Sequence, residues 1–131
     1  MKAKLMSTTP EFLELIDMSN SEDPKFQLST DVLYILKFDN EIYTIEVPQG
    51  FKTDFASVPK KFRSIIGNVN KYNKCWLLHD WMYDKRCDFK VSRKEADDIL
   101  KDLLDQKGMN ELDQWLTYTS VRLFGASRFR R

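Results

Sequence analysis

The sequence predicts a single α+β domain over residues 1–131, with a small N-terminal antiparallel β-hairpin or sheet followed by a three-helix C-terminal half. Two short segments rich in β-branched and aromatic residues, 31–38 and 41–47, flank Asp39-Asn40, a dipeptide that suits a two-residue turn. Ser92 and Glu95 have the spacing of a capping box, which marks the start of a helix. Apolar residues after this point recur at helical spacing.

The chain divides into segments by pattern. Residues 11–18 have the pattern of a short helix, and residues 19–24 read as a polar loop. Further on, Pro59 is placed to begin a short helix that Gly67 would end. The expected order is a leader (1–24), a β-hairpin (25–50), a motif loop with a short helix (51–67), a helical half (70–125) and a basic tail (126–131).

Three helices are expected in the helical half. The first runs from about Tyr72 to Tyr83, the second begins at Ser92 and is capped by Lys107-Gly108, and the third extends from Asn110 to Gly125. We expect Trp76, Trp81 and Trp115 in the core. The stripes expected to be buried are Ala96, Ile99, Leu100, Leu103 and Leu104 on the second helix, and Leu112, Trp115, Leu116 and Thr119 on the third.

Composition excludes several classes of function. Hydrophobic residues at 42% and charged residues at 31% are typical of a soluble globular protein. The net charge of +1, with only short basic runs, argues against nucleic-acid binding. No apolar run approaches the ~20 residues of a membrane span, and the first ten residues lack the apolar core of a signal peptide. Two cysteines are too few for a disulfide scaffold and fit a reducing compartment.

His79 is the only histidine, so any histidine-based proton transfer must run through it. On the first helix His79 shares a face with Cys75 and Tyr83, while Asp80 and Asp84 lie on another edge. For Asp80 a metal-binding role and a simple solvated position are equally open, and for Asp84 the solvated position is favoured.

Asp97 is the expected partner of His79. It lies at the margin of the apolar stripe of the second helix and would reach His79 if that helix packs on the first. A carboxylate that accepts the Nδ1–H bond would fix the tautomer and leave Nε2 free as a base. The simpler alternative is a surface charge paired with Arg93 or Lys101 one turn away.

The loop from Thr53 to Pro59 is a second candidate. Local turn capping explains Ser57 well and Asp54 less well. A loop carboxylate and loop carbonyls are the ligands that Ca²⁺ takes. One histidine and two scattered cysteines provide no zinc spacing, and no G-x-S-x-G elbow supports Ser57 as a nucleophile.

Three ordered motifs resemble a phage-encoded family of unknown function. They are Gly50–Pro59 (GFKTDFASVP), Leu78–Tyr83 (LHDWMY) and Ser92–Asp97 (SRKEAD). The resemblance implies a bacteriophage or prophage origin. It implies a product that acts in the host cytoplasm or in the virion, with the phage particle or a host protein as partner.

A shorter resemblance joins Cys75-x-x-x-His79-Asp80-x-x-Tyr83 and Asp97 to the catalytic helix pair of secretory-type phospholipase A. It implies that His79 is the general base, that Asp80 ligates Ca²⁺, and that Tyr83 and Asp97 orient the network. The chain departs from that family in lacking its disulfides and its glycine-rich calcium loop, which the Thr53–Pro59 loop would replace, and in beginning with a β-hairpin.

Two functional hypotheses follow. In the first, the protein is a hydrolase of a lipid or of a cell-envelope ester or amide, in which His79 deprotonates water and Asp97 and Tyr83 assist it. Asp80 and Asp54 would hold Ca²⁺ at the oxyanion, and Thr53, Phe55 and Ser57 would contact the substrate. In the second, the protein is a non-enzymatic virion component or host-binding protein in which the same residues form a structural polar network.

Overall fold

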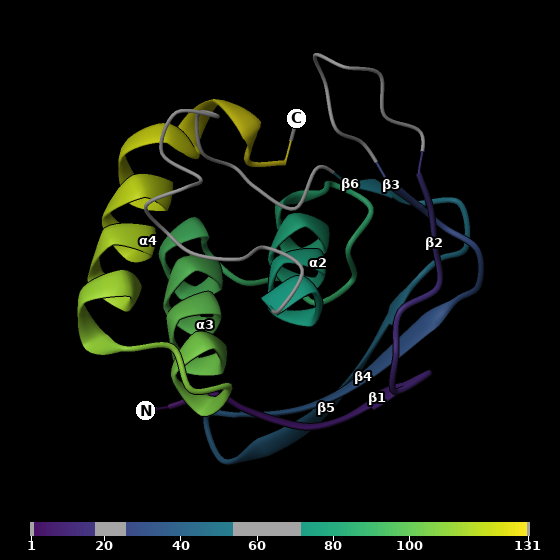
Figure 1. Cartoon of the computed structure of the whole chain (residues 1–131), viewed down its shortest axis with the longest axis horizontal. Coiled ribbons are helices and arrows are strands. Elements are labelled where there is room, and N and C mark those ends of the chain that lie inside the picture. Colours follow the sequence, from purple (N-terminus) through teal and green to yellow (C-terminus); the bar gives the residue numbers. More distant parts are fainter. Residues whose placement is uncertain (1, 18–25, 54–71, 131) are drawn as a thin grey trace.

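The computed structural model describes residues 2–17, 26–53 and 72–130 and has the expected α+β architecture (Figure 1). Within these residues, six strands form two antiparallel sheets of order β1-β4-β5 and β2-β3-β6. The strands are β1 (Lys4–Thr9), β2 (Leu15–Asp17), β3 (Phe26–Leu28), β4 (Val32–Phe38), β5 (Glu41–Val47) and β6 (Lys52–Thr53). The helices are α2 (Asn73–Tyr83), α3 (Arg93–Gln106), α4 (Glu111–Phe124) and the short 3₁₀ helix η2 (Ala126–Arg128).

The predicted hairpin is confirmed as β4 and β5. Its turn places Asp39 and Asn40 at φ values of 54° and 65°, the left-handed region that these two residues tolerate. The alternation of side chains along β4 fully buries Val32, Tyr34 and Leu36 on one face, where they form part of the core.

The described part of the leader, residues 2–17, contains two strands, and the helix predicted from residue 11 onward is wrong there. Residues 15–17 form β2, which pairs with β3, while β1 pairs with β4. The other edge of β1 is bonded by α3, because Asp102 accepts from the amide of Ala3 and Gln106 bonds both backbone groups of Leu5. The partners of β1 lie far away in the sequence, and β2 pairs with the nearby strand β3, so strand pairing overrides the local helical pattern.

The helical half follows the prediction in its boundaries. Ser92 and Glu95 form the complete capping box of α3, Asn110 caps α4, and Gly108 has a φ of 92° after the end of α3. In Figure 1, α2 lies between α3 and the sheets, and α4 packs on the outer side of α3. Because α2 is surrounded, nearly all its side chains are buried, including Trp76 and Trp81.

The predicted buried face of α4 is wrong. Leu112 and Trp115 are 65% and 60% exposed, and Leu116 and Thr119 are only partly buried. The face that packs inward instead carries Gln114, Thr117, Ser120 and Val121. This inner face is polar because it bonds to α3 and to the connection after it. Gln114 donates to Asp105 and to the carbonyl of Met109, and Tyr118 donates to Asp98.

Some expectations fall on residues 18–25 and 54–71, outside the described part of the chain. These are the loop at 19–24 and the short helix between Pro59 and Gly67. Among the helices that are described, none has the length and apolar character needed to cross a bilayer.

Strand β5 offers a matched pair of substitutions that tests the position of the core. Ile45 is 4% exposed and Ile42 on the same strand is 59% exposed. We expect Ile45→Ala to lower the free energy of unfolding by about 2–5 kcal/mol because it leaves a cavity. Ile42→Ala should cost less than about 1 kcal/mol. Urea unfolding of the two variants measures the difference, and equal losses would contradict this orientation of the hairpin.

Candidate functional site

The packing of α2 on α3 brings His79 and Asp97 together. The ring nitrogen Nε2 of His79 lies 2.7 Å from Oδ1 of Asp97, and both side chains are fully inaccessible to solvent. His79 is carried by the central helix, and Asp97 by the margin of the apolar face of α3. The expected meeting of these two residues therefore occurs, and it occurs inside the protein.

The ring is turned the other way from the prediction. Asp97 engages Nε2, whereas we expected it to accept from Nδ1 and to leave Nε2 free. An ionised carboxylate only accepts hydrogen bonds, so Nε2 is the nitrogen that carries hydrogen. Nδ1 is buried and has no hydrogen-bond partner in the described part of the chain. In the neutral ring the available lone pair is therefore that of Nδ1.

Asp97 accepts hydrogen bonds from two further side chains. The hydroxyl of Tyr83 donates to Oδ1 at 2.5 Å, and the guanidinium of Arg122 donates to Oδ2 at 2.8 Å. Arg93, one turn before Asp97, lies 3.8 Å from the same Oδ2. The alternative pairing with Arg93 thus exists as a weaker contact beside the bond to His79.

These contacts determine the charge of the carboxyl. Burial acts to raise the pKa of Asp97, but the hydrogen bonds from His79, Tyr83 and Arg122 outweigh it and hold this pKa below its ordinary value. Burial, followed by the neighbouring carboxylate, raises the pKa of Tyr83 well above its ordinary value. Tyr83 consequently stays protonated and remains a donor to Asp97.

The position of Tyr83 depends on a glycine. A Cβ added at Gly125 would lie 2.6 Å from the carbonyl oxygen of Val121 and 2.8 Å from the hydroxyl of Tyr83. The ring of Tyr83 also lies against that of His79, with centroids 4.4 Å apart, and against Phe129 at 5.1 Å. The end of α4 therefore closes over the site and leaves room only for hydrogen at position 125.

Asp80 lies apart from the bond between His79 and Asp97. It is partly buried, and its Oδ2 accepts a hydrogen bond from the hydroxyl of Thr53 at the end of β6. Thr53 is thereby held next to the predicted metal ligand. The other predicted residues of that loop, Asp54, Phe55 and Ser57, lie outside the described residues. Asp84 pairs with Arg86 at 2.9 Å on the surface.

No group of three or more His, Cys, Asp and Glu side chains in the described ranges is arranged to hold a metal ion. Because Ca²⁺ takes six to eight oxygen ligands, the described residues alone do not fit it. A calcium site built on Asp80 would need ligands from the loop that contains Asp54.

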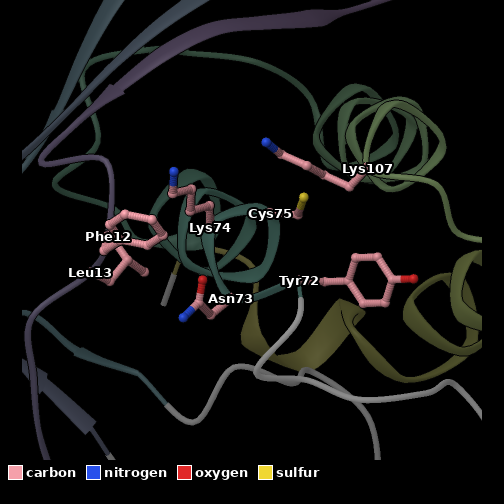
Figure 2. A pocket seen from close by; sticks show the side chains of 7 residues that line it. All are labelled: Phe12, Leu13, Tyr72, Asn73, Lys74, Cys75 and Lys107. Carbon is pink, nitrogen blue, oxygen red and sulfur yellow. The ribbon is translucent and has the colours of Figure 1, made fainter.

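A cavity of about 380 Å³ lies at the start of α2, and Figure 2 shows it between Phe12, Lys74 and Lys107. Cys75 lies at its base. Burial raises the pKa of the Cys75 thiol to about 12, so this cysteine is a poor nucleophile. His79 and Asp97 do not line this cavity.

Arg122 is the participant that the sequence did not reveal. It lies in the last turn of α4, 25 residues after the carboxylate that it contacts. Its role depends on which face of α4 packs inward, and the apolar stripe of that helix points to the other face. A cation in the last turn, which favours a helix C-terminus, was the only available signal.

Fold and site together define an α+β protein with a buried His–Asp pair between two helices. The chain belongs to the family described as "Protein of unknown function (DUF1353)", whose match covers residues 26–121. The matched range includes His79, Tyr83 and Asp97 and ends just before Arg122. No curated protein and no solved structure matches the chain.

The charge of Asp97 makes a pH-dependent contribution to stability. Its pKa is depressed in the folded state, so this contribution is present above the ordinary aspartate value near 3.9 and is lost as the pH falls through the lower folded value. We expect Asp97→Asn to be less stable than wild type at pH 7 by about 1.5–3 kcal/mol. This difference should shrink below about pH 4.

Urea unfolding from pH 7 to pH 3 measures that difference. Asp88→Asn, which alters an exposed carboxylate, is the matched control and should follow wild type throughout. A deficit of Asp97→Asn that stays constant at every pH would contradict an ionised, stabilising Asp97.

Proposed function

We propose that this chain is a bacteriophage accessory protein that works as a histidine-dependent hydrolase, with His79 as general base. The proposed substrate is a lipid or a cell-envelope ester or amide. The phage origin is supported by the three ordered motifs around Asp54, His79 and Asp97, and the chemistry by the buried pair of His79 and Asp97.

The observation that carries the proposal is that Nδ1 of His79 has no hydrogen-bond partner among the residues that the structure describes. A buried polar atom without a hydrogen bond costs about 1–3 kcal/mol, and folded proteins satisfy nearly all of them. Most buried polar atoms of a structural network have a hydrogen-bond partner, so a lone Nδ1 beside a buried carboxylate supports a chemical role. With Nε2–H committed to Asp97, Nδ1 is an acceptor suited to a water molecule or a substrate hydroxyl.

The proposed proton path follows from this geometry. Nδ1 accepts the proton of a water molecule as the water oxygen attacks the substrate carbonyl or phosphoryl group. The imidazolium so formed is stabilised by the Asp97 carboxylate at Nε2, 2.7 Å away. The imidazolium then returns this proton to the leaving oxygen or nitrogen as the bond of that atom to the carbonyl or phosphoryl group breaks. Tyr83 and Arg122 hold that carboxylate in place and in its charged form. General-base assistance of this kind is worth about 10²–10⁴ in rate.

Calcium and the substrate contacts remain predictions within the proposal. Asp80 is the described member of the proposed metal pair, and Thr53, bonded to it, is the described member of the substrate loop. Activity measured with added calcium and with a chelator tests its involvement, and Asp80→Asn tests the ligand.

A second candidate function has its own observation. His79 and Asp97 are both 0% exposed, which is what a structural network requires and what an active site open to its substrate does not have. Under this alternative the protein is a virion component or binds a host factor. The side chains of His79, Tyr83, Asp97 and Arg122 then serve to fix α2, α3 and α4 against one another.

His79→Gln distinguishes the two functions. The amide nitrogen of glutamine matches Nε2 and can still donate to Asp97, but nothing replaces Nδ1. We expect the variant to fold. Phospholipids, peptidoglycan and simple esters are assayed, and on the substrate that wild type hydrolyses the variant should be about 10²–10⁴-fold slower. His79→Ala, which removes both nitrogens, should lose activity and also about 1–3 kcal/mol of stability.

Wild type, His79→Gln and His79→Ala are purified identically, so a contaminating hydrolase would act equally in all three. Rates that do not differ between wild type and a folded His79→Gln would refute the hydrolase and favour the structural role.

A further inference from the structure

The outward face of α4 carries an apolar stripe that the other described residues leave largely uncovered. Leu112, Trp115, Leu116, Thr119 and Leu123 fall within an arc of about 100° on this helix, opposite the face that packs on α3. Leu112, Trp115 and Leu123 are 65%, 60% and 68% exposed. Among the described helices, α4 is the one that lies farthest out in Figure 1, and it packs on α3.

Single exposed apolar residues are ordinary, but a continuous stripe of large ones marks a surface that another protein covers. Of these side chains only Leu116 packs partly on the core of the described residues. The inner face attaches α4 to the domain through the hydrogen bonds of Gln114, Tyr118 and Arg122 and through buried Val121. Leu112, Trp115 and Leu123 therefore have no packing role in the described fold.

We propose that this face is the interface of a homodimer, in which α4 packs antiparallel on α4 of a second copy about a two-fold axis. Charge supports this occupant. Glu111 and Arg122 lie on the same flank of the stripe, at opposite ends of the helix. In an antiparallel two-fold pair each flank faces the same flank of the other copy, so Glu111 meets Arg122 of the second copy at both ends.

A parallel arrangement lacks this complementarity. It would place Glu111 of one copy beside Asp113 on the other flank of the second copy, at the same height, where like charges repel. Arg122 remains available to a second partner, because its side chain is 32% exposed and the guanidinium has donors beyond the one that bonds Asp97.

Side-chain size agrees with the antiparallel register. With Leu112 opposite Leu123 of the second copy, Leu116 lies opposite Thr119 of that copy. Trp115 then lies between Thr119 and Arg122 of that copy, where the small threonine leaves room for the indole and the guanidinium can stack on it. Large residues thus face small or planar ones across the axis.

Sedimentation velocity of the full chain at increasing concentrations up to about 1 mM tests the dimer. We expect a reversible dimer for wild type, and a monomer at the same concentrations for Trp115→Ser and for Leu123→Ser. Ile42→Ser is the matched control, since it removes an apolar side chain that is 59% exposed on β5, away from the stripe, and it should still dimerise. Circular dichroism verifies that each variant is folded, and the two separate stripe variants keep the test decisive if one of them is not.

Disulfide trapping tests the orientation. A mixture of Leu112→Cys and Leu123→Cys chains should form the mixed disulfide under a mild oxidant, while Leu112→Cys alone should not form a linked pair. The native Cys75 and Cys87 are buried and do not compete. A wild-type chain that is monomeric at every concentration overturns the proposal, and so does efficient linkage of Leu112→Cys to itself.

Discussion

The buried charge of Asp97 is the constraint on which the helical half depends. A carboxylate removed from water is costly unless opposite charge and hydrogen-bond donors replace its hydration. Here the donors come from three elements: His79 and Tyr83 on α2, Arg122 on α4, and Arg93 on α3 itself as a longer ion pair. Each helix must keep its position for the charge to remain satisfied, so the network ties the relative placement of all three.

The same arrangement decides what His79 can do. Asp97 uses Oδ1 to accept from both His79 and Tyr83, and Oδ2 to accept from Arg122, so its acceptor capacity is largely committed. The ring is thereby held with Nε2–H inward and Nδ1 as its remaining lone pair. With the carboxylate satisfied in this way, the buried Nδ1 of His79 has no hydrogen-bond partner among the described residues.

Local patterns made much of the fold predictable. The Asp39-Asn40 turn, the Ser92 capping box and the apolar stripe of α3 each depend on residues close in sequence, and each is present as predicted. The contact between His79 and Asp97 was also predictable from the sequence, since it requires only that two consecutive helices pack on each other. Strand β1 was not predictable from local pattern, because its partners are β4 and the α3 side chains Asp102 and Gln106, all distant in sequence. Strand β2 has only three residues, too few to show a strand pattern, although its partner β3 is near in sequence.

Two details of the site could not be predicted from the sequence: the orientation of the His79 ring and the face of α4 that packs inward. Helical periodicity places His79 on a face but does not say which ring nitrogen meets Asp97. For α4 the usual rule fails because its buried face is the polar one, so the pattern pointed to Leu112 and Trp115, and Arg122 was missed for the same reason.

The helix α4 packs inward with its polar face and exposes its apolar face, and this arrangement links the proposed site to the proposed interface. A helix that attaches to its domain through hydrogen bonds can leave its apolar side for association, and Arg122 lies at the boundary between the two faces. Its bond to Asp97 holds the guanidinium at that boundary, where Glu111 of a second copy could reach it. If the dimer forms, the two-fold contact adds a negative charge beside Arg122, which draws on the same cation that stabilises the Asp97 carboxylate. The state of association and the charge balance around His79 are then coupled through one side chain, without any movement of the backbone.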